Sequence, residues 1–322
     1  MKITIDVDKL LAEGRIDREE YIRLKSFATE DTGSLAFNIL ISFGVIAVTL
    51  GAMALLPSAL TAIALGLALS GYGIHIQTKY AQTWGLLGTI LLLVGTLLGS
   101  GGILDITQGG VIGFLLVMLV CAVGGILAKR TLLMIIATLA LSATVGAMAM
   151  YGFASYFLVI RQPLITVLLF SGLGWGAYFF SLKLAADSSH LAIAVSRTSL
   201  FLVNFGFWVG SLWGDSLWLQ TDSWSFDSNT IIPDWFFAWT WAITLIGTAI
   251  WAARQNRRWA VNALSVFGAI HFYTQYFENL GASPLTLLMA GVIALGIAVA
   301  IARYNRPPHR PVAAIDPTSD QP

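Results

Sequence analysis

The sequence predicts an all-α polytopic membrane protein with about ten transmembrane helices and a small N-terminal cytoplasmic helical hairpin. Three observations favour this class: 57% of the 322 residues are hydrophobic, only 11% are charged, and the apolar residues form long continuous runs. A soluble globular domain carries about 25% charged residues, so this chain has too few to cover a wetted surface. The strands of a membrane β-barrel alternate apolar and polar residues, which these runs do not.

The ten predicted helices follow from the length of the apolar runs. A hydrocarbon core about 30 Å thick needs roughly 20 apolar residues of helix. Residues 131–160 are longer than one crossing requires but too short for two, so we assign one helix there. The predicted helices cover about 35–56, 58–76, 82–104, 110–128, 131–155, 163–181, 191–213, 234–254, 259–280 and 283–303.

Prolines mark four of the predicted helix starts, where the missing N–H has no intrahelical partner. These prolines are Pro57, Pro163, Pro233 and Pro284. The pattern Gly95-x-x-x-Gly99 predicts a close approach between helices. The sequence therefore divides into a hairpin at 1–34, a transmembrane domain at 35–303 and a proline-rich, disordered cytoplasmic tail at 304–322.

The N-terminal segment has the capping residues of a two-helix hairpin. Asp6 can cap a first helix, and Gly14 suits the left-handed position that ends it. Asp17 can cap the second helix, with Glu20 three residues later as in a capping box. Two interpretations remain open: the hairpin lies against the inner leaflet, or it contacts a protein partner.

Lysines and arginines predict the orientation, because they concentrate in cytoplasmic loops. Ten helices place sixteen of them on the side of the N-terminus and only Arg161 on the opposite side, while Arg197 lies within a helix. The sixteen are Lys2, Lys9, Arg15, Arg18, Arg23, Lys25, Lys79, Lys129, Arg130, Lys183, Arg254, Arg257, Arg258, Arg303, Arg306 and Arg310. We therefore expect both termini in the cytoplasm, with the chain in a bacterial inner (plasma) membrane.

Five polar residues inside predicted helices form the candidate site, because ionisable groups at membrane depth are rare and often functional. They are Arg197, Asn204, His271, Gln275 and Glu278. Arg197 could instead reach the cytoplasmic surface or pair with a neighbouring helix. The three residues of the ninth predicted helix suit a proton or cation pathway, or equally a hydrogen-bonded contact between helices.

The predicted outer loop at 214–233 is the only long one, and tryptophans gather in or beside it. We interpret them as a belt at the membrane interface, with a binding lid as the alternative. They are Trp208, Trp213, Trp218, Trp224, Trp235, Trp239 and Trp241. Four acidic residues accompany them, namely Asp215, Asp222, Asp227 and Asp234.

The sequence predicts neither an enzyme nor a cofactor. No zinc-protease, nucleophile-elbow or phosphate-loop motif is present. Cys121 is the only cysteine and the four histidines are spread in depth, so we expect no metal site. A net charge of +1 lacks the basic face that nucleic-acid binding requires.

The N-terminal hairpin and the paired helices at 35–104 resemble an uncharacterised bacterial membrane-protein family, domain of unknown function 2157. The stretch Arg257-Arg258-x-x-x-Asn262 leading to Tyr273 and Phe277 is similar to that family's C-terminal end. The tryptophan that relatives carry after the first helix is replaced here by Leu55-Leu56-Pro57. The resemblance implies no particular activity.

Two functions remain as hypotheses for a protein whose partners include the lipid bilayer. The first is transport or binding of a small-molecule solute, because ten helices divide into five plus five, the arrangement of inverted-repeat transporters. The alternative is a membrane scaffold or sensor that contacts a protein partner through its N-terminal hairpin. An intramembrane enzyme is disfavoured because the sequence shows no nucleophile and base pair.

Overall fold

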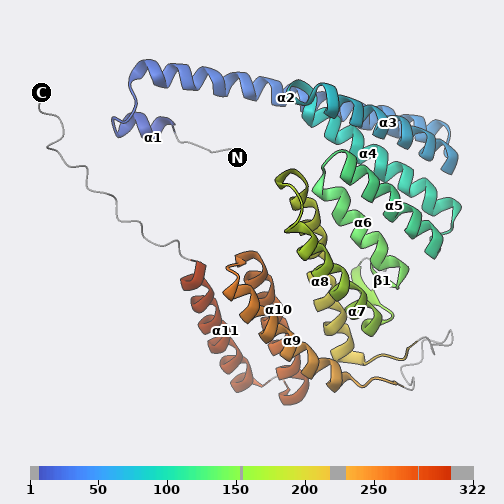
Figure 1. The fold of residues 1–322 in the computed structure, drawn as a ribbon, viewed down its shortest axis with the longest axis vertical. Helices are drawn as coiled ribbons and strands as arrows, with labels where there is room; N and C mark the ends of the chain where they lie inside the picture. The colour runs from blue at the N-terminus through green and yellow to red at the C-terminus, as the bar shows by residue number, and fades with distance from the viewer. Residues whose placement is uncertain (1–6, 153–154, 218–229, 282, 306–322) are drawn as a thin grey trace, which may run out of the picture. The chain divides into compact units, whose positions relative to one another are not determined.

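The structure, a computed structural model, describes residues 7–152, 155–217, 230–281 and 283–305. These residues form eleven helices and one two-stranded sheet (Figure 1). The chain divides into two compact units, Met1–Val159 with Gly172–Ser199, and Ile160–Ser171 with Leu200–Pro322. Helices α7 (Pro163–Ser181) and α8 (Ala186–Trp213) each contribute to both units. The all-α class predicted from composition is confirmed.

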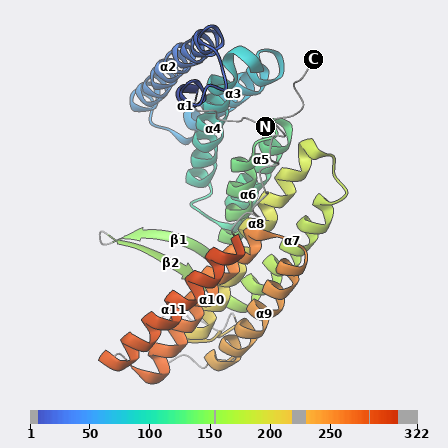
Figure 2. The same cartoon turned by 90° about the vertical axis from the view of Figure 1, so that its left-hand side faces the viewer.

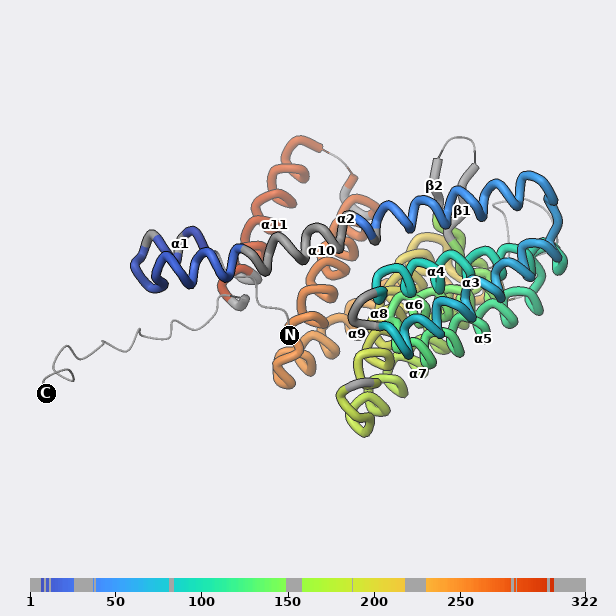
Figure 3. Tube along the Cα trace, turned by 90° about the horizontal axis from the view of Figure 1, so that it is seen from above, coloured from blue at the N-terminus to red at the C-terminus, as the bar shows by residue number. Residues whose placement is uncertain are grey.

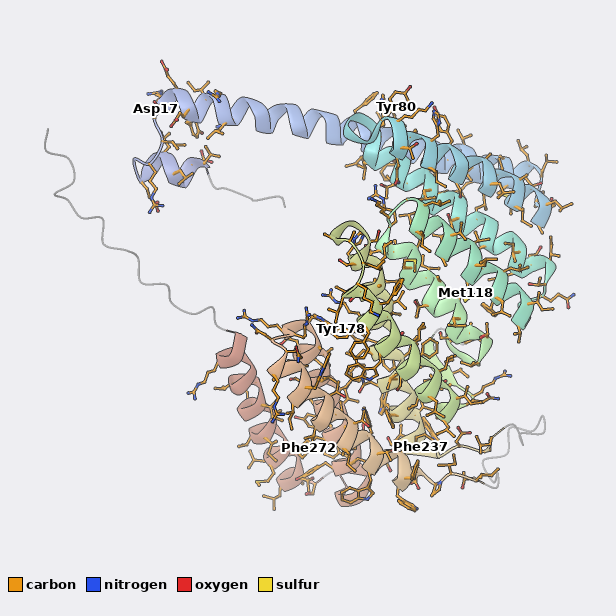
Figure 4. All side chains as sticks on the ribbon, in the orientation of Figure 1. Asp17, Tyr80, Met118, Tyr178, Phe237 and Phe272 are labelled. Carbon is orange, nitrogen blue, oxygen red and sulfur yellow. The ribbon has the colours of Figure 1, made fainter. Side chains whose placement is uncertain are left out.

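The N-terminal hairpin forms from the capping residues that predict it. Helix α1 (Val7–Ala12) is followed by Gly14, whose φ of +67° is the left-handed conformation that glycine adopts most readily and that closes a helix end. Asp17, labelled in Figure 4, accepts a 2.7 Å hydrogen bond from the Glu20 backbone N–H and caps α2. The Tyr21 hydroxyl donates to Asp8 at 2.7 Å and ties the two helices together. The predicted cap at Asp6 lies outside the described residues.

Helix α2 (Arg18–Leu55) continues without a break from the hairpin into the first apolar run. The boundary predicted at residue 34 therefore falls inside a helix. The Lys25 ammonium donates to the Tyr21 hydroxyl at 2.8 Å, and this hydrogen bond raises the pKa of Lys25 above its ordinary value. The hairpin is thus attached to the apolar part of the chain by one continuous helix.

Helices α3 (Ala59–Lys79) and α4 (Ala81–Ile106) lie side by side, as Figures 1 and 3 show. Glycines on both helices let the backbones touch. A Cβ on Gly66 would stand 2.6 Å from the Cα of Gly99, and one on Gly95 would stand 2.5 Å from the Ser70 nitrogen. The close approach predicted from Gly95 and Gly99 is confirmed.

Helices α5 (Val111–Leu127) and α6 (Thr131–Thr144) form the next pair. They pack through a cluster that includes Val117, Cys121 and Ala137. The turn between them is a Schellman motif, in which the Arg130 N–H donates to the Gly125 carbonyl at 2.9 Å. Lys129 occupies the left-handed position of this motif with φ +52°.

The helix predicted at 131–155 is wrong beyond Thr144. A hairpin of β1 (Ala147–Gly152) and β2 (Ser155–Ile160) follows α6, and Figure 2 draws the strands as adjacent arrows of opposite direction. Gly146 takes a φ of +76°, which ends the helix. The Ser142 hydroxyl donates to the Ala147 carbonyl at 2.8 Å and fixes the exit of the chain. Aromatic and β-branched residues in β2 then favour an extended backbone.

The remaining helices are α9 (Asp234–Arg254), α10 (Arg258–Leu280) and α11 (Pro284–Asn305). Nine of the ten predicted helices are confirmed to within five residues at each end, apart from the longer start of α2. The predicted prolines stand within two residues of the starts of α3, α7, α9 and α11. The part of the predicted tail that follows residue 305 lies outside the described residues.

Five described helices are long and apolar enough to cross a membrane: Ala59–Lys79, Trp84–Ile106, Pro163–Ser181, Ser188–Trp213 and Asp234–Arg254. Four apolar helices are shorter, and α10 has 23 residues but a more polar sequence. Helix α6, with 14 residues, is about 21 Å long at 1.5 Å per residue. The helices therefore fit a multi-pass membrane protein, whereas ten crossings stay a prediction.

Candidate functional site

Helices α8, α9 and α10 meet at a buried hydrogen bond in the second unit. The Trp241 indole N–H on α9 donates to the Asn204 Oδ1 on α8 at 2.9 Å. The Asn204 Nδ2 donates in turn to the Leu200 carbonyl at 2.8 Å. Asn204 is 3% exposed and Trp241 is fully buried. Both polar groups are therefore satisfied by protein, as buried polar groups must be.

His271 on α10 extends this cluster. Its ring meets the Trp241 ring edge to face, with centroids 4.7 Å apart and an interplanar angle of 72°. The His271 Nδ1 is buried and has no hydrogen-bond partner within the described residues. A buried polar atom left unpaired costs about 1–3 kcal/mol. This nitrogen is therefore the place in the cluster where a ligand or a water molecule would gain most.

A second hydrogen bond joins α8 to α10 one turn further along. The Trp208 indole N–H donates to the Thr274 hydroxyl at 3.2 Å. The side-chain nitrogen of the neighbouring Gln275 is buried. Since residues four apart share a helix face, His271 and Gln275 lie on the same face of α10. We call Asn204, Trp208, Trp241, His271, Thr274 and Gln275 the polar cluster.

Aromatic rings lie within about one helical turn of the polar cluster on all three helices. Phe267 on α10 meets Phe201 and Phe205 of α8 at ring distances of 5.5 and 5.3 Å. Phe237, labelled on α9 in Figure 4, is buried, and a Cβ on Gly210 would stand 2.6 Å from its ring. Such rings exclude water and lower the local dielectric, which strengthens each polar contact inside.

The structure brings some of the five predicted site residues together. Asn204 and His271 both contact Trp241, and Gln275 lies one turn from His271. Glu278 is exposed near the end of α10. Arg197 is exposed and belongs to the first unit.

The sequence did not indicate the role of Trp241. As part of an interfacial belt it should be accessible, yet it is fully buried, so the belt prediction is wrong for this residue. The available signal for burial was the position of Trp241 in the helix, two turns inside α9. Trp235 and Trp239, nearer the start of the helix, are 61% and 68% exposed. Trp213 is exposed as well, and Trp218 and Trp224 lie outside the described residues.

Asp215 is a buried carboxylate that the sequence grouped with an acidic loop. Its Oδ2 accepts from the Leu164 N–H at 2.8 Å, and its Oδ1 accepts from the Leu217 N–H at 2.9 Å. Its backbone pairs with Ile232 in an antiparallel bridge. An anion at the first turn of α7 is favoured by the helix dipole. Asp215 therefore caps α7 and is committed to structure.

The fold defines an α-helical protein with the apolar helices of a multi-pass membrane protein. Among the described residues, no three His, Cys, Asp or Glu side chains are placed to share a metal ion. No family model matches the chain, and no curated protein or solved structure is significantly similar to it.

Proposed function

We propose that this chain is a ten-helix membrane protein that binds a small polar solute at the polar cluster as a step in transporting it. The observation that carries the proposal is the buried His271 Nδ1, which has no hydrogen-bond partner in the described part of the chain. Its neighbours Trp241 and Asn204 are fixed by their own hydrogen bond, so the position is preorganised. Preorganised polar groups within an apolar surround are typical of small-molecule sites.

The proposed topology rests on helix order and charge. Ten helices follow α1, in the order that the apolar runs predict. With ten crossings, sixteen lysines and arginines lie on the side of the N-terminus and Arg161 alone lies opposite. The positive-inside rule then places both termini in the cytoplasm. A bacterial inner membrane, and membership of the family of domain of unknown function 2157, belong to the same proposal.

The chemistry of the cluster limits the solute. An imidazole nitrogen donates one hydrogen bond or accepts one, depending on the tautomer. No described acidic side chain belongs to the cluster. A neutral or zwitterionic solute with hydroxyl, amide or amine groups and an apolar part therefore fits better than a bare metal cation. Arg197 and Glu278 stay as candidates that rest on the sequence.

The test is a stability screen of the purified full-length protein against a defined panel of amino acids, hexoses, nucleosides and short organic acids. We expect at least one compound to raise Tm, because a ligand that binds only the folded state stabilises it by mass action. The His271→Leu variant should lose that shift. The Gly268→Ala variant is the matched control on α10, because a Cβ there has no atom within 4 Å.

Uptake of the same radiolabelled compound into proteoliposomes then separates transport from binding. Uptake that His271→Leu abolishes supports transport. Binding without uptake supports the alternative, a sensor, for which α2 offers a continuous helix from the hairpin into the apolar region. The proposal fails if no compound shifts Tm, or if His271→Leu keeps the full shift.

A further inference from the structure

A second polar site lies in the first unit, at the turn between α5 and α6. Lys129 and Arg130 directly follow the 17 apolar residues of α5 and precede the 14 residues of α6. Because both helices are predominantly apolar and contain no charged residue, a charged turn that joins them is expected at the surface of the bilayer. Ile126, Leu127 and Leu132, beside the turn, are all between 48% and 61% exposed.

Arg130 is held in one orientation by the neighbouring helices. Its Nε donates to the Gln77 Oε1 on α3 at 3.2 Å. The Gln77 Nε2 donates to the Thr89 hydroxyl on α4 at 3.4 Å. The guanidinium is half-buried, and its two Nη groups make no hydrogen bond or ion pair with another described residue. Four N–H donors on a fixed plane are thus presented without an acidic partner among the described residues.

A hydrogen bond from α8 also fixes the backbone of the turn. The His190 Nε2–H on α8 donates to the Lys129 carbonyl at 3.3 Å. The end of α3 that holds Gln77 also carries Tyr72 and His75 and is followed directly by Tyr80, with successive ring centroids 6.3 Å apart. Tyrosines in exposed positions near a helix end are typical of the membrane interface.

We propose that Arg130, oriented by Gln77, binds the phosphate of an anionic phospholipid headgroup in the adjoining leaflet. A planar guanidinium matches phosphate oxygens with two parallel hydrogen bonds. The exposed side chains of Ile126, Leu127 and Leu132 supply apolar contact for acyl chains, which a free phosphate could not use. Lys129 adds a second positive charge at the headgroup level. The inference requires the turn to lie at the membrane surface but does not depend on the solute site.

The experiment is native mass spectrometry of the full-length protein in detergent, titrated with dioleoyl phosphatidylglycerol. We expect Arg130→Gln to weaken binding about tenfold and Arg130→Lys, which keeps the charge, about threefold. Gln77→Ala should also weaken it about threefold, because the guanidinium is no longer oriented. Arg254→Gln should bind as the wild type does, since Arg254 is an exposed arginine at the end of α9 with the same charge change.

Two competitors identify the ligand. Dioleoyl phosphatidylcholine, which has the same chains and no net charge, should bind at least tenfold more weakly than phosphatidylglycerol. Inorganic phosphate at millimolar concentration should not displace the bound lipid. The proposal is overturned if Arg130→Gln and Gln77→Ala both bind like Arg254→Gln, if the two lipids bind equally, or if inorganic phosphate removes phosphatidylglycerol. Far-UV circular dichroism of each variant verifies that the fold is kept.

Discussion

Two regions of the molecule join helices in opposite ways. Helices α3 and α4 meet through glycines, so that a Cβ on Gly73 would stand 2.6 Å from the Leu92 nitrogen. Helices α8, α9 and α10 meet through large rings and side-chain hydrogen bonds around Trp241 and Asn204. The first region brings backbones together, and the second fills the space between them.

The two kinds of helix packing can be compared by what each contributes to a protein in a membrane. Lipid chains are as apolar as leucine, so helices in a bilayer gain little from hiding apolar surface. Close backbone packing supplies dispersion energy and leaves no room for a ligand. Packing through rings and polar side chains provides hydrogen-bonding groups that can select a ligand. It also leaves a buried atom, the His271 Nδ1, without a partner in the described residues. Stability should therefore be concentrated in the first region and binding in the second.

The largest expected effect is that of Gly95→Ala on α4. The new Cβ would stand 2.5 Å from the Ser70 nitrogen and 2.7 Å from the Gly66 carbonyl oxygen, and backbone atoms cannot move aside cheaply. We expect a loss of about 3 kcal/mol in the free energy of unfolding. SDS titration in mixed micelles measures it. Gly101→Ala on the same helix is the control, because nothing lies within 4 Å of its Cβ, and equal losses in the two variants would contradict the packing account.

The next effect is that of Trp241→Phe in the second region. Removal of the indole N–H leaves the Asn204 Oδ1 buried without its 2.9 Å donor, which costs about 2 kcal/mol. Trp239→Phe makes the same chemical change at a site that is 68% exposed and should cost less than about 0.5 kcal/mol. The same SDS titration compares them. A cycle with Asn204→Leu should recover part of the loss, and additive losses would mean that the hydrogen bond contributes nothing.

Most of the fold follows from the sequence because apolar length and helix ends are local properties. The turn at Gly14, the cap at Asp17 and the four proline starts each depend on residues within one helical turn. The wrong prediction of a helix after Thr144 also comes from reading a local property, the apolar character of the run. The run at 131–160 is apolar whether its backbone is helical or extended, so hydropathy could not separate the two. Gly146, with φ +76°, was the local signal that the helix ends.

The candidate site was less predictable because its contacts join distant parts of the chain. Asn204 and His271 could be selected as polar residues in apolar helices, but their shared partner Trp241 is 37 residues from Asn204. Tryptophan occurs both at membrane interfaces and in protein cores, and tertiary packing decides which of the two a given tryptophan occupies. The sequence indicates only the charge of Arg130, because nothing local relates it to Gln77, 53 residues earlier.

A smaller effect should follow from Asp215→Asn, which tests the side-chain cap at the start of α7. The carboxylate accepts from the Leu164 and Leu217 N–H groups on separate oxygens, and an amide would turn one acceptor into a donor facing an N–H. We expect a loss of about 1.5 kcal/mol, again by SDS titration. Asp234→Asn, at an exposed first-turn position of α9, should change stability by less than about 0.5 kcal/mol. A tolerant Asp215 would show that α7 needs no side-chain cap.

The smallest effect should be that of Ser70→Ala in the first region. The Ser70 and Thr96 hydroxyl oxygens are 3.3 Å apart, a long hydrogen bond whose loss should cost about 0.5 kcal/mol in the same assay. The Ser70 Oγ is also one of the atoms that a Cβ on Gly95 would meet, at 2.6 Å. The double variant Ser70→Ala/Gly95→Ala removes that contact but keeps the two backbone contacts. It should therefore remain nearly as unstable as Gly95→Ala alone. A recovery of more than about 1 kcal/mol would show that a side chain, rather than the backbone of α3, requires glycine at position 95.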